Sequence, residues 1–452
     1  MNNYLRFCFI LCFLILQMSF KVEAGDLNAV ELYRRCFAQL TQNQFPVNDS
    51  VYLQVKANKK NPITACLELV DKAKLVKVKD GYRLSNPKDF LAVTVLNTMY
   101  QLHQTFFMNK TLDFLGSQSG FFDEAEPALF YTLALFGPST KVSSILTLDS
   151  NLVADRTENN PKLSSDGYFL SDLSQPSTAN LIWASKGNLI GVVNNKKITL
   201  VTNEDIKRKV DLFTSRGGGI IGTPTYLMES VQENFIFKAD SFKIPRKWAK
   251  AVFSDFLCRY LPVVNYEDAK TYVVNDSAAH AFRRSESCTL CHASMDRMAA
   301  VNRNFKYDQY FLTSSTYPTT ITKGGTDWPA VVTENYSSQP TNGVLYFRNY
   351  KGNLVNQTVT SIKDLGAKIT NQDDFFICAA KRYYQYFTGV DVDVFNPQDS
   401  RFRNKGTDMQ KHQQNVVKLG LDLKKHQSLK TLIKDILNLP VYKSSNLGIT
   451  NN

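Results

Sequence analysis

Five consecutive residues constrain this chain of 452 residues more than any other stretch: Cys288-Thr289-Leu290-Cys291-His292. The order Cys-x-x-Cys-His is the attachment pattern of c-type haem. Two thiols three residues apart on one turn can add to the two vinyl groups of a single haem, and the next imidazole can ligate the iron from the same side. About 0.002 such pentapeptides are expected by chance at this composition. The pattern therefore predicts one covalent haem c, attached to Cys288 and Cys291 and ligated by His292.

Other interpretations of the same two cysteines stay open. A redox-active dithiol would be expected in a βαβ context, and no such pattern surrounds the pair. A zinc site would need a second pair of ligands at suitable spacing, which the neighbouring sequence does not provide. A structural disulfide between the two cysteines is the remaining alternative. Each of these predicts an absence of covalent haem.

The sixth ligand of a haem iron is less well defined by the sequence. No methionine lies between Ala299 and Asp408, where a small cytochrome usually supplies one, and no histidine lies between Ala293 and Lys411. The remaining candidates are Met409, His412 and His426 downstream of the motif and His280 and Met228 upstream of it. Of these, Met409 is our distal candidate. A five-coordinate iron is the alternative, and it would favour peroxide or ligand chemistry over simple electron transfer.

The first 24 residues have the organisation of a secretory signal peptide. Arg6 precedes an apolar run at 7–16, and Val22 and Ala24 fit the small-residue cleavage pattern before Gly25. An uncleaved anchor is the alternative. We expect a protein exported to the periplasm or cell surface of a bacterium, where covalent haem attachment is completed. No internal stretch reaches the roughly 18–20 apolar residues of a spanning helix, so we expect no integral membrane span after signal cleavage.

Export places the remaining cysteines in an oxidising compartment. Apart from the signal and the haem motif, the chain contains Cys36, Cys66, Cys258 and Cys378, which allow three pairings. We predict the bridges Cys36–Cys66 and Cys258–Cys378, because each then lies within one half of the chain. Four buried thiols are the alternative.

The hydrophobic pattern predicts a mainly α fold with minor β-hairpins. Leu91, Val95, Met99, Leu102 and Phe106 recur at helical spacing, and we expect His103 on that face to be an ordinary core or boundary residue. Strands at 189–193 and 198–201 flank Asn194-Asn195 and predict one hairpin. Strands at 344–347 and 354–359 flank Lys351-Gly352 and predict a second.

Helical patterns return in the C-terminal half. Pro245 fits the first turn of a helix that runs to about Tyr260, before Pro262. Thr370 and Asp373 have capping-box spacing before a helix that Gly389 ends. Ser428 is a candidate cap for a final helix, ended by Pro440. The Thr-, Ser-, Pro- and Gly-rich stretch at 314–343 predicts a long loop.

Two weaker patterns favour ordinary structure. Gly217, Gly219 and Gly222 match the spacing of a dinucleotide-binding loop, but no βαβ unit surrounds them, so we predict a turn. The acidic and amide residues Asp391, Asp393, Asn396 and Asp399 could suggest calcium, but their spacing misses the EF-hand loop, and a solvated loop is the better prediction.

The order of several segments resembles a known family. Arg216-Gly217-Gly218-Gly219, then Pro245-Arg246-Lys247-Trp248, Leu257-Cys258, His280 and the haem motif with Asp296 come in the order seen in planctomycete-type cytochrome c domain proteins. The helices containing Phe376-Ile377-Cys378 and Leu429–Tyr442 are similar to later segments of that family. The resemblance covers about Ser215 to Tyr442 and implies an exported c-type haem protein. The sequence departs from the family at Arg297, Lys247 and Val390, where proline, glycine and arginine are usual.

Together these features predict a signal peptide at 1–24, a mainly helical domain at 25–205 with a β-hairpin near its end, and a cytochrome c-like haem domain at 206–452. The leading hypothesis is electron transfer. A peroxidase-like haem oxidoreductase and a non-catalytic exported binding or structural protein are the alternatives. The formal charge of +12 is spread along the chain without a basic stripe interleaved with aromatic residues, which argues against nucleic acid and allows docking to an acidic redox partner.

Overall fold

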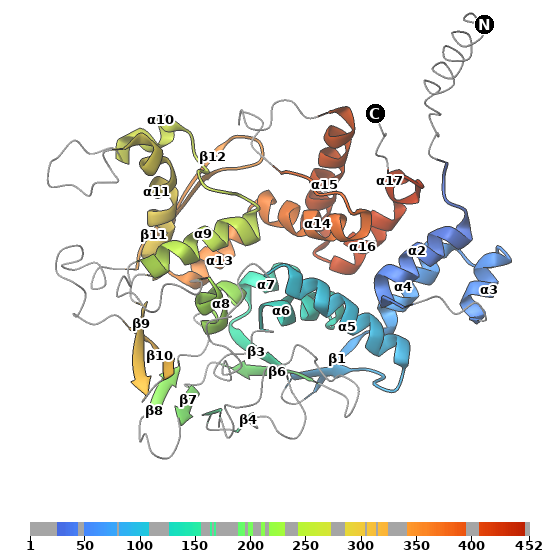
Figure 1. Ribbon diagram of the computed structural model, residues 1–452, viewed down its shortest axis with the longest axis horizontal. Coiled ribbons are helices and arrows are strands. Elements are labelled where there is room, and N and C mark those ends of the chain that lie inside the picture. Colours follow the sequence, from blue (N-terminus) through green and yellow to red (C-terminus); the bar gives the residue numbers. More distant parts are fainter. Residues whose placement is uncertain are drawn as a thin grey trace, which may run out of the picture.

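The computed structural model describes most of the chain from Gly25 to Leu447 and none of the predicted signal peptide. The described residues are 25–43, 49–78, 81–107, 126–154, 163–164, 167–168, 189–194, 198–201, 209–212, 217–230, 243–272, 285–302, 305–312, 315–323, 341–394 and 406–447. The fold is mainly helical with small antiparallel sheets, which confirms the predicted class at that level (Figure 1). No helix in the described ranges is long and apolar enough to cross a membrane.

The N-terminal half is a group of helices whose ends are set by short polar side chains. The helices are α2 (Ala29–Thr41), α3 (Ser50–Lys56), α4 (Pro62–Lys72), α5 (Phe90–Thr105), α6 (Glu126–Phe136) and α7 (Ser144–Thr147). Asn28, Asp49, Asn61 and Asp89 each accept hydrogen bonds from backbone N–H groups at the start of α2 to α5. Those N–H groups have no partner within the helix, so each cap stabilises its helix by about 1 kcal/mol.

The strands of this half do not pair as the sequence predicted. The largest sheet joins β1 (Leu75–Val78), β2 (Gly81–Leu84), β6 (Leu189–Asn194) and β3 (Ser150–Ala154), in that order and antiparallel throughout. Because β6 has β2 on one edge and β3 on the other, it cannot also pair with β7 (Ile198–Val201). The predicted hairpin of these two strands is therefore wrong. Instead β7 pairs with β8 (Lys209–Leu212), and β4 (Leu163–Ser164) pairs with β5 (Gly167–Tyr168).

A tight glycine turn connects the two halves of the core. Gly217, Gly218 and Gly219 all have positive φ, and they lead into the 3₁₀ turn η3 (Gly219–Gly222) and α8 (Pro224–Glu229). A Cβ on Gly219 would lie 2.1 Å from the carbonyl oxygen of Ile145, so only glycine fits there. The closely spaced glycines therefore allow a turn whose backbone packs tightly against its neighbours, which agrees with the predicted turn.

The middle of the chain carries the Cys-x-x-Cys-His motif. It contains α9 (Lys243–Leu257), α10 (Tyr266–Ala269), η5 (Lys270–Tyr272), α11 (Glu286–Ala299) and η7 (Ala300–Asn302). Pro245 lies in the first turn of α9, as predicted, and the helix ends before Cys258, which has a φ of 51°. The hairpin of β11 (Gly343–Arg348) and β12 (Leu354–Val359) is confirmed.

The predicted loop at 314–343 is wrong over its first part. Residues Ser315–Lys323 form β10, which pairs antiparallel with β9 (Phe305–Leu312). The stretch is rich in threonine and also contains Tyr317 and Ile321, residue types that favour a strand in spite of Pro318, which lies at a register shift between the two strands. The part of the predicted loop at 324–340 lies outside the described residues.

The C-terminal half ends in a helical group made of α13 (Ile362–Thr370), α14 (Asp373–Thr388), α15 (Thr407–His426), α16 (Leu429–Asn438) and α17 (Pro440–Lys443). The predicted capping box of Thr370 and Asp373 is wrong, because Thr370 is the last residue of α13, and α14 has no side-chain cap. Two other predictions for this region are confirmed. Gly389 ends α14 with a φ of 70°, and Ser428 caps α16 by accepting from the N–H of Thr431.

One continuous cluster of buried residues runs from Leu32 to Tyr442 and includes both halves of the chain. Helix α14 lies near its centre, in contact with α9, α13, α15 and α16 (Figure 1). His103 is fully buried in this cluster, as predicted. The proposed domain boundary at 205/206 falls outside the described residues.

The two ends of the described chain meet. Asp26 and Ser444 form a β-bridge, and the N–H of Leu27 donates to the carbonyl of Lys443 at 2.8 Å. The guanidinium of Arg35 on α2 donates to the carbonyls of Tyr442 and Ser444 at 2.6 and 3.0 Å. The first helix is thereby attached directly to the last one.

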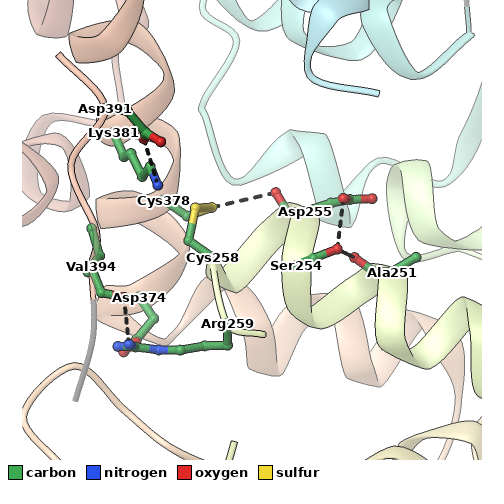
Figure 2. The surroundings of a disulfide bond; sticks show 10 residues. All are labelled: Ala251, Ser254, Asp255, Cys258, Arg259, Asp374, Cys378, Lys381, Asp391 and Val394. Carbon is green, nitrogen blue, oxygen red and sulfur yellow. Dashed lines mark hydrogen bonds and ion pairs between the residues drawn. A yellow bond between two sulfur atoms is a disulfide. The ribbon is translucent and has the colours of Figure 1, made fainter. Parts of the chain in front are cut away.

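Both predicted disulfides are present. Cys36–Cys66 joins α2 to α4, and Cys258–Cys378 joins the end of α9 to α14 (Figure 2). Beside the second bridge, the buried guanidinium of Arg259 forms an ion pair with Asp374, which is 1% exposed, and donates to the carbonyl of Val394 at 2.8 Å (Figure 2).

Candidate functional site

The Cys-x-x-Cys-His motif lies in the first half of α11. Ala293, Met298 and Ala299 on this helix are fully buried, and the helix packs against β11 and α9. Cys288, Cys291 and His292 are separated by three and four positions, so all three project from one face of the helix. The helix therefore presents two thiols and an imidazole together, as the spacing predicts.

The two motif cysteines differ from the others in the described part of the chain. Cys36, Cys66, Cys258 and Cys378 are all in disulfides, whereas Cys288 and Cys291 are in none. Cys288 is exposed and Cys291 is half-buried. Both positions therefore leave thiols that a reagent outside the protein can approach.

The imidazole of His292 is held by a chain of side-chain contacts. Its Nδ1 lies 3.1 Å from both carboxylate oxygens of Asp296, one helical turn later. Asp296 in turn accepts two hydrogen bonds from Arg246 on α9, from Nε at 2.7 Å and from Nη2 at 2.9 Å. This bidentate pair fixes the carboxylate, and the carboxylate fixes the ring. Metal-ligating histidines commonly have such a carboxylate on the nitrogen that does not touch the metal.

The electrostatics of Asp296 favour its ionised form. Burial raises the pKa of this carboxyl, but the hydrogen bond to His292 and the charge of Arg246 outweigh burial and leave the pKa below its ordinary value. An ionised Asp296 accepts a hydrogen bond from the Nδ1–H of His292, so Nε2 is the nitrogen through which this ring would coordinate iron.

The C-terminal half of α11 is fixed against its neighbours by aromatic and charged contacts. The guanidinium of Arg297 lies between the rings of Tyr272 and Tyr346, 4.2 and 4.3 Å from their centroids. Arg348 on β11 makes two hydrogen bonds to Asp268 on α10, at 2.7 and 2.8 Å. Arg297 thus attaches η5 and β11 to the helix that carries the motif, and Arg348 attaches α10 to β11. These neighbouring elements hold the helix in place.

The structure does not bring the downstream ligand candidates to the motif. Met409, His412 and His426 all lie on α15, which Figure 1 places across the molecule from α11, beyond α9 and α14. Met409 is partly buried against the core. His412 is 2% exposed and its Nδ1 is within 2.5 Å of the hydroxyl of Tyr384, while the Nδ1 of His426 accepts from the N–H of Ser428 at 3.2 Å.

The upstream candidates give no further information. His280 lies outside the described residues, and Met228 is on α8, where its side chain is outside them too. Within the described ranges, no group of three or more His, Cys, Asp or Glu side chains could hold a metal ion. Of the residues weighed for calcium, Asp391 forms an ion pair with Lys381 at 3.1 Å, and Asn396 and Asp399 lie outside the described part.

The sequence predicted the motif, and the family resemblance includes both Asp296 and Arg246, but neither predicted that these two side chains pair. Asp296 was named from the family resemblance, and its spacing of four from His292 on a helix is a signal that could also have found it. Arg246 lies 50 residues upstream of Asp296, and no local pattern links the two.

In comparisons with known proteins, no family model, no curated protein and no solved structure matches this chain.

Proposed function

We propose that this protein is a c-type cytochrome-like protein that carries one covalent haem on Cys288 and Cys291 and transfers electrons. The observation that carries the proposal is the arrangement on α11: two cysteines outside any disulfide and a histidine share one helix face, and the histidine is oriented by an ionised carboxylate. The resemblance of 215–442 to planctomycete-type cytochrome c domain proteins supports it, with the part from 206 onward as the haem domain.

In this proposal each residue has a defined task. The thiols of Cys288 and Cys291 form the two thioether bonds, and Nε2 of His292 ligates the iron. Bound haem supplies one-electron redox chemistry. Asp296 holds the proton on Nδ1 of His292 and makes the imidazole a stronger ligand, and Arg246 keeps Asp296 in place. The signal-like segment at 1–24 supports an exported protein, and a redox partner of acidic surface fits the excess of positive charge.

The test is a haem stain on a denaturing gel together with a pyridine haemochrome spectrum, after expression in a host that exports the protein and attaches c-type haem. We expect about one haem per chain. The variant Cys288→Ala should change the haemochrome to that of a single thioether, and Cys288→Ala/Cys291→Ala should abolish the stain. Ser287→Ala, on the neighbouring exposed residue, is the matched control and should retain it. An unstained parent protein in that host would refute the proposal.

The spectrum of the loaded protein separates electron transfer from oxidoreductase chemistry. A low-spin spectrum indicates a sixth protein ligand and favours electron transfer, and a high-spin spectrum favours an enzyme with an open iron position. Met409→Ala tests the distal candidate directly, because a methionine ligand would be lost from the spectrum. Asp296→Asn should lower the basicity of His292 and raise the reduction potential, whereas Asp422→Asn on distant α15 should leave it unchanged.

A further inference from the structure

A second site lies away from the haem motif, in a cleft of ≈ 780 Å³ between α5, α9 and α14. Its size is that of a small-molecule site rather than of a packing defect. Leu102 and Phe106 line it from the end of α5, and residues from Lys247 to Cys258 line it from α9. The stretch from Lys381 to Tyr386 on α14 forms the third wall. Three elements that are far apart in sequence therefore converge on one cavity.

The most unusual group in this cleft is the guanidinium of Arg382. It lies over the ring of Phe106, 4.9 Å from the centroid, and 5.7 Å from that of Phe107. Its Nη1 is buried and has no hydrogen-bond acceptor among the described residues. A buried N–H group without an acceptor is destabilising, and for a charged group the penalty is larger. Because Arg382 lines the cleft, a small turn of its guanidinium would let an oxygen anion bound there supply the missing acceptor and recover this free energy.

The charges around Arg382 have the sign that an anion needs. Four cationic side chains, Lys247, Lys250, Lys381 and Arg382, line the cleft with two anionic ones, Asp255 and Asp391. Both carboxylates already have partners. Asp391 forms an ion pair with Lys381 at 3.1 Å, as Figure 2 shows.

Asp255 accepts hydrogen bonds from the hydroxyls of Tyr226 at 2.6 Å and Ser254 at 3.1 Å. With four cationic and two anionic side chains in its lining, the cleft keeps an excess of positive charge, contributed by Lys247 and Lys250 of α9 and by Lys381 and Arg382 of α14.

The remaining lining is apolar or aromatic. Leu102, Phe106, Ala251, Tyr260 and Tyr386 contribute hydrocarbon and ring surface to the same cavity. Tyr260 is 63% exposed, although tyrosine rings are usually at least partly covered. An apolar wall beside a forked cation suits a ligand that has a charged end and an apolar body.

We propose that this cleft binds a small organic anion, with its carboxylate or phosphate group on Arg382 and its apolar body against the rings of Phe106 and Tyr260. The planar guanidinium can donate two parallel hydrogen bonds to either group. Lys247 and Lys250 supply additional positive charge to the lining. The site is separate from the motif on α11 and its ligand needs no haem, so the proposal does not rest on the proposed function.

Isothermal titration calorimetry of the purified full-length protein with phenyl phosphate, benzoate and inorganic phosphate tests this proposal. We expect phenyl phosphate or benzoate to bind more tightly than inorganic phosphate, because only these fill the apolar part of the cleft. The stronger of the two identifies the anionic group. Arg382→Gln should weaken binding about ten- to a hundredfold, the usual effect of losing hydrogen bonds to a charged partner. Higher salt should weaken binding in the parent protein.

Lys411→Gln is the matched control, because it removes the same charge from an exposed position on α15 and should leave the affinity unchanged. If Arg382→Gln does not fold by circular dichroism, Lys247→Gln/Lys250→Gln replaces it and should weaken binding several-fold. Binding that is equal in parent and variant refutes the proposal. So does a lack of binding by all three probes up to about 10 mM, or an equal affinity for phenyl phosphate and inorganic phosphate.

Discussion

Acidification should destabilise this fold through one buried side chain, His103. Its ring is fully enclosed, with Nδ1 2.8 Å from the hydroxyl of Thr132 and Nε2 2.6 Å from the hydroxyl of Tyr383. The Thr132 hydroxyl donates its only hydrogen to the carbonyl of Ala128 at 2.9 Å. Thr132 must therefore accept from Nδ1–H, and Nε2 accepts from Tyr383. The neutral ring makes both of its hydrogen bonds, to Thr132 and from Tyr383. A proton on Nε2 would point at the hydrogen of the Tyr383 hydroxyl, so the charged ring conflicts with this arrangement.

The size of the effect follows from the pKa of this ring. Burial lowers the pKa of His103 from 6.5 to about 3, because a charged imidazole is poorly solvated in the core. Between these two values the unfolded chain binds a proton that the folded chain does not, so stability is complete above pH 6.5 and is lost as the pH falls. At about pH 5, roughly 1.5 units below the unfolded pKa, the loss is about 2 kcal/mol.

The assay is urea unfolding of the parent protein and of His103→Gln at several values between about pH 7.5 and about pH 5. The variant starts less stable because it loses packing and hydrogen bonds, but its stability should fall by about 2 kcal/mol less over this range than that of the parent. Burial also lowers the pKa of His412, so His412→Gln should remove a separate share of the pH dependence. If parent and His103→Gln lose the same stability on acidification, the reasoning is wrong.

Three further perturbations test the fold. Gly219→Ala places a methyl group against backbone atoms at a φ of 56° and should lower the free energy of unfolding by about 3 kcal/mol. Gly389→Ala has a φ of 70° but open space around it, so it should lower the free energy of unfolding by only about 1 kcal/mol. Thermal melts of the two variants test this difference. Replacing Cys258 and Cys378 with serine removes a disulfide that joins residues 120 positions apart, and it should lower the free energy of unfolding in urea by about 5 kcal/mol. A variant that keeps the full stability of the parent would contradict this. Asp374→Asn leaves the buried guanidinium of Arg259 without its counter-charge, so it should lower the free energy of unfolding in urea by about 3–5 kcal/mol. A decrease of less than about 1 kcal/mol would contradict a buried ion pair.

Features that depend on neighbouring residues could be predicted from the sequence. The hairpin of β11 and β12, the cap at Ser428 and the stop at Gly389 are each set within a few positions of the chain, and all three are confirmed. The disulfides could be predicted because only four cysteines remained once those of the predicted signal peptide and of the Cys-x-x-Cys-His motif were set aside.

Features that depend on distant partners could not be predicted. Strand β6 looked like half of a hairpin, but residues more than 100 positions earlier, in β2, occupy one of its edges. Thr370 had the spacing of a cap, but a helix that begins at Ile362 already includes it. The same limit applies to the candidate site, because Arg246 reaches Asp296 only through the packing of α9 on α11.

The contact between the two ends of the described chain has a consequence for biosynthesis. Arg35 on helix α2 and Leu27 just before it bind backbone carbonyls of residues 442–444, and 407 positions of the chain separate Arg35 from Tyr442. During synthesis, helix α2 therefore waits for these much later residues before this set of its contacts is complete. Contacts of such sequence separation slow folding, so the newly made chain stays open for longer. A chain truncated before Tyr442 would lose these contacts and expose the part of α2 that they cover, and exposed segments of this kind are what chaperones and proteases recognise.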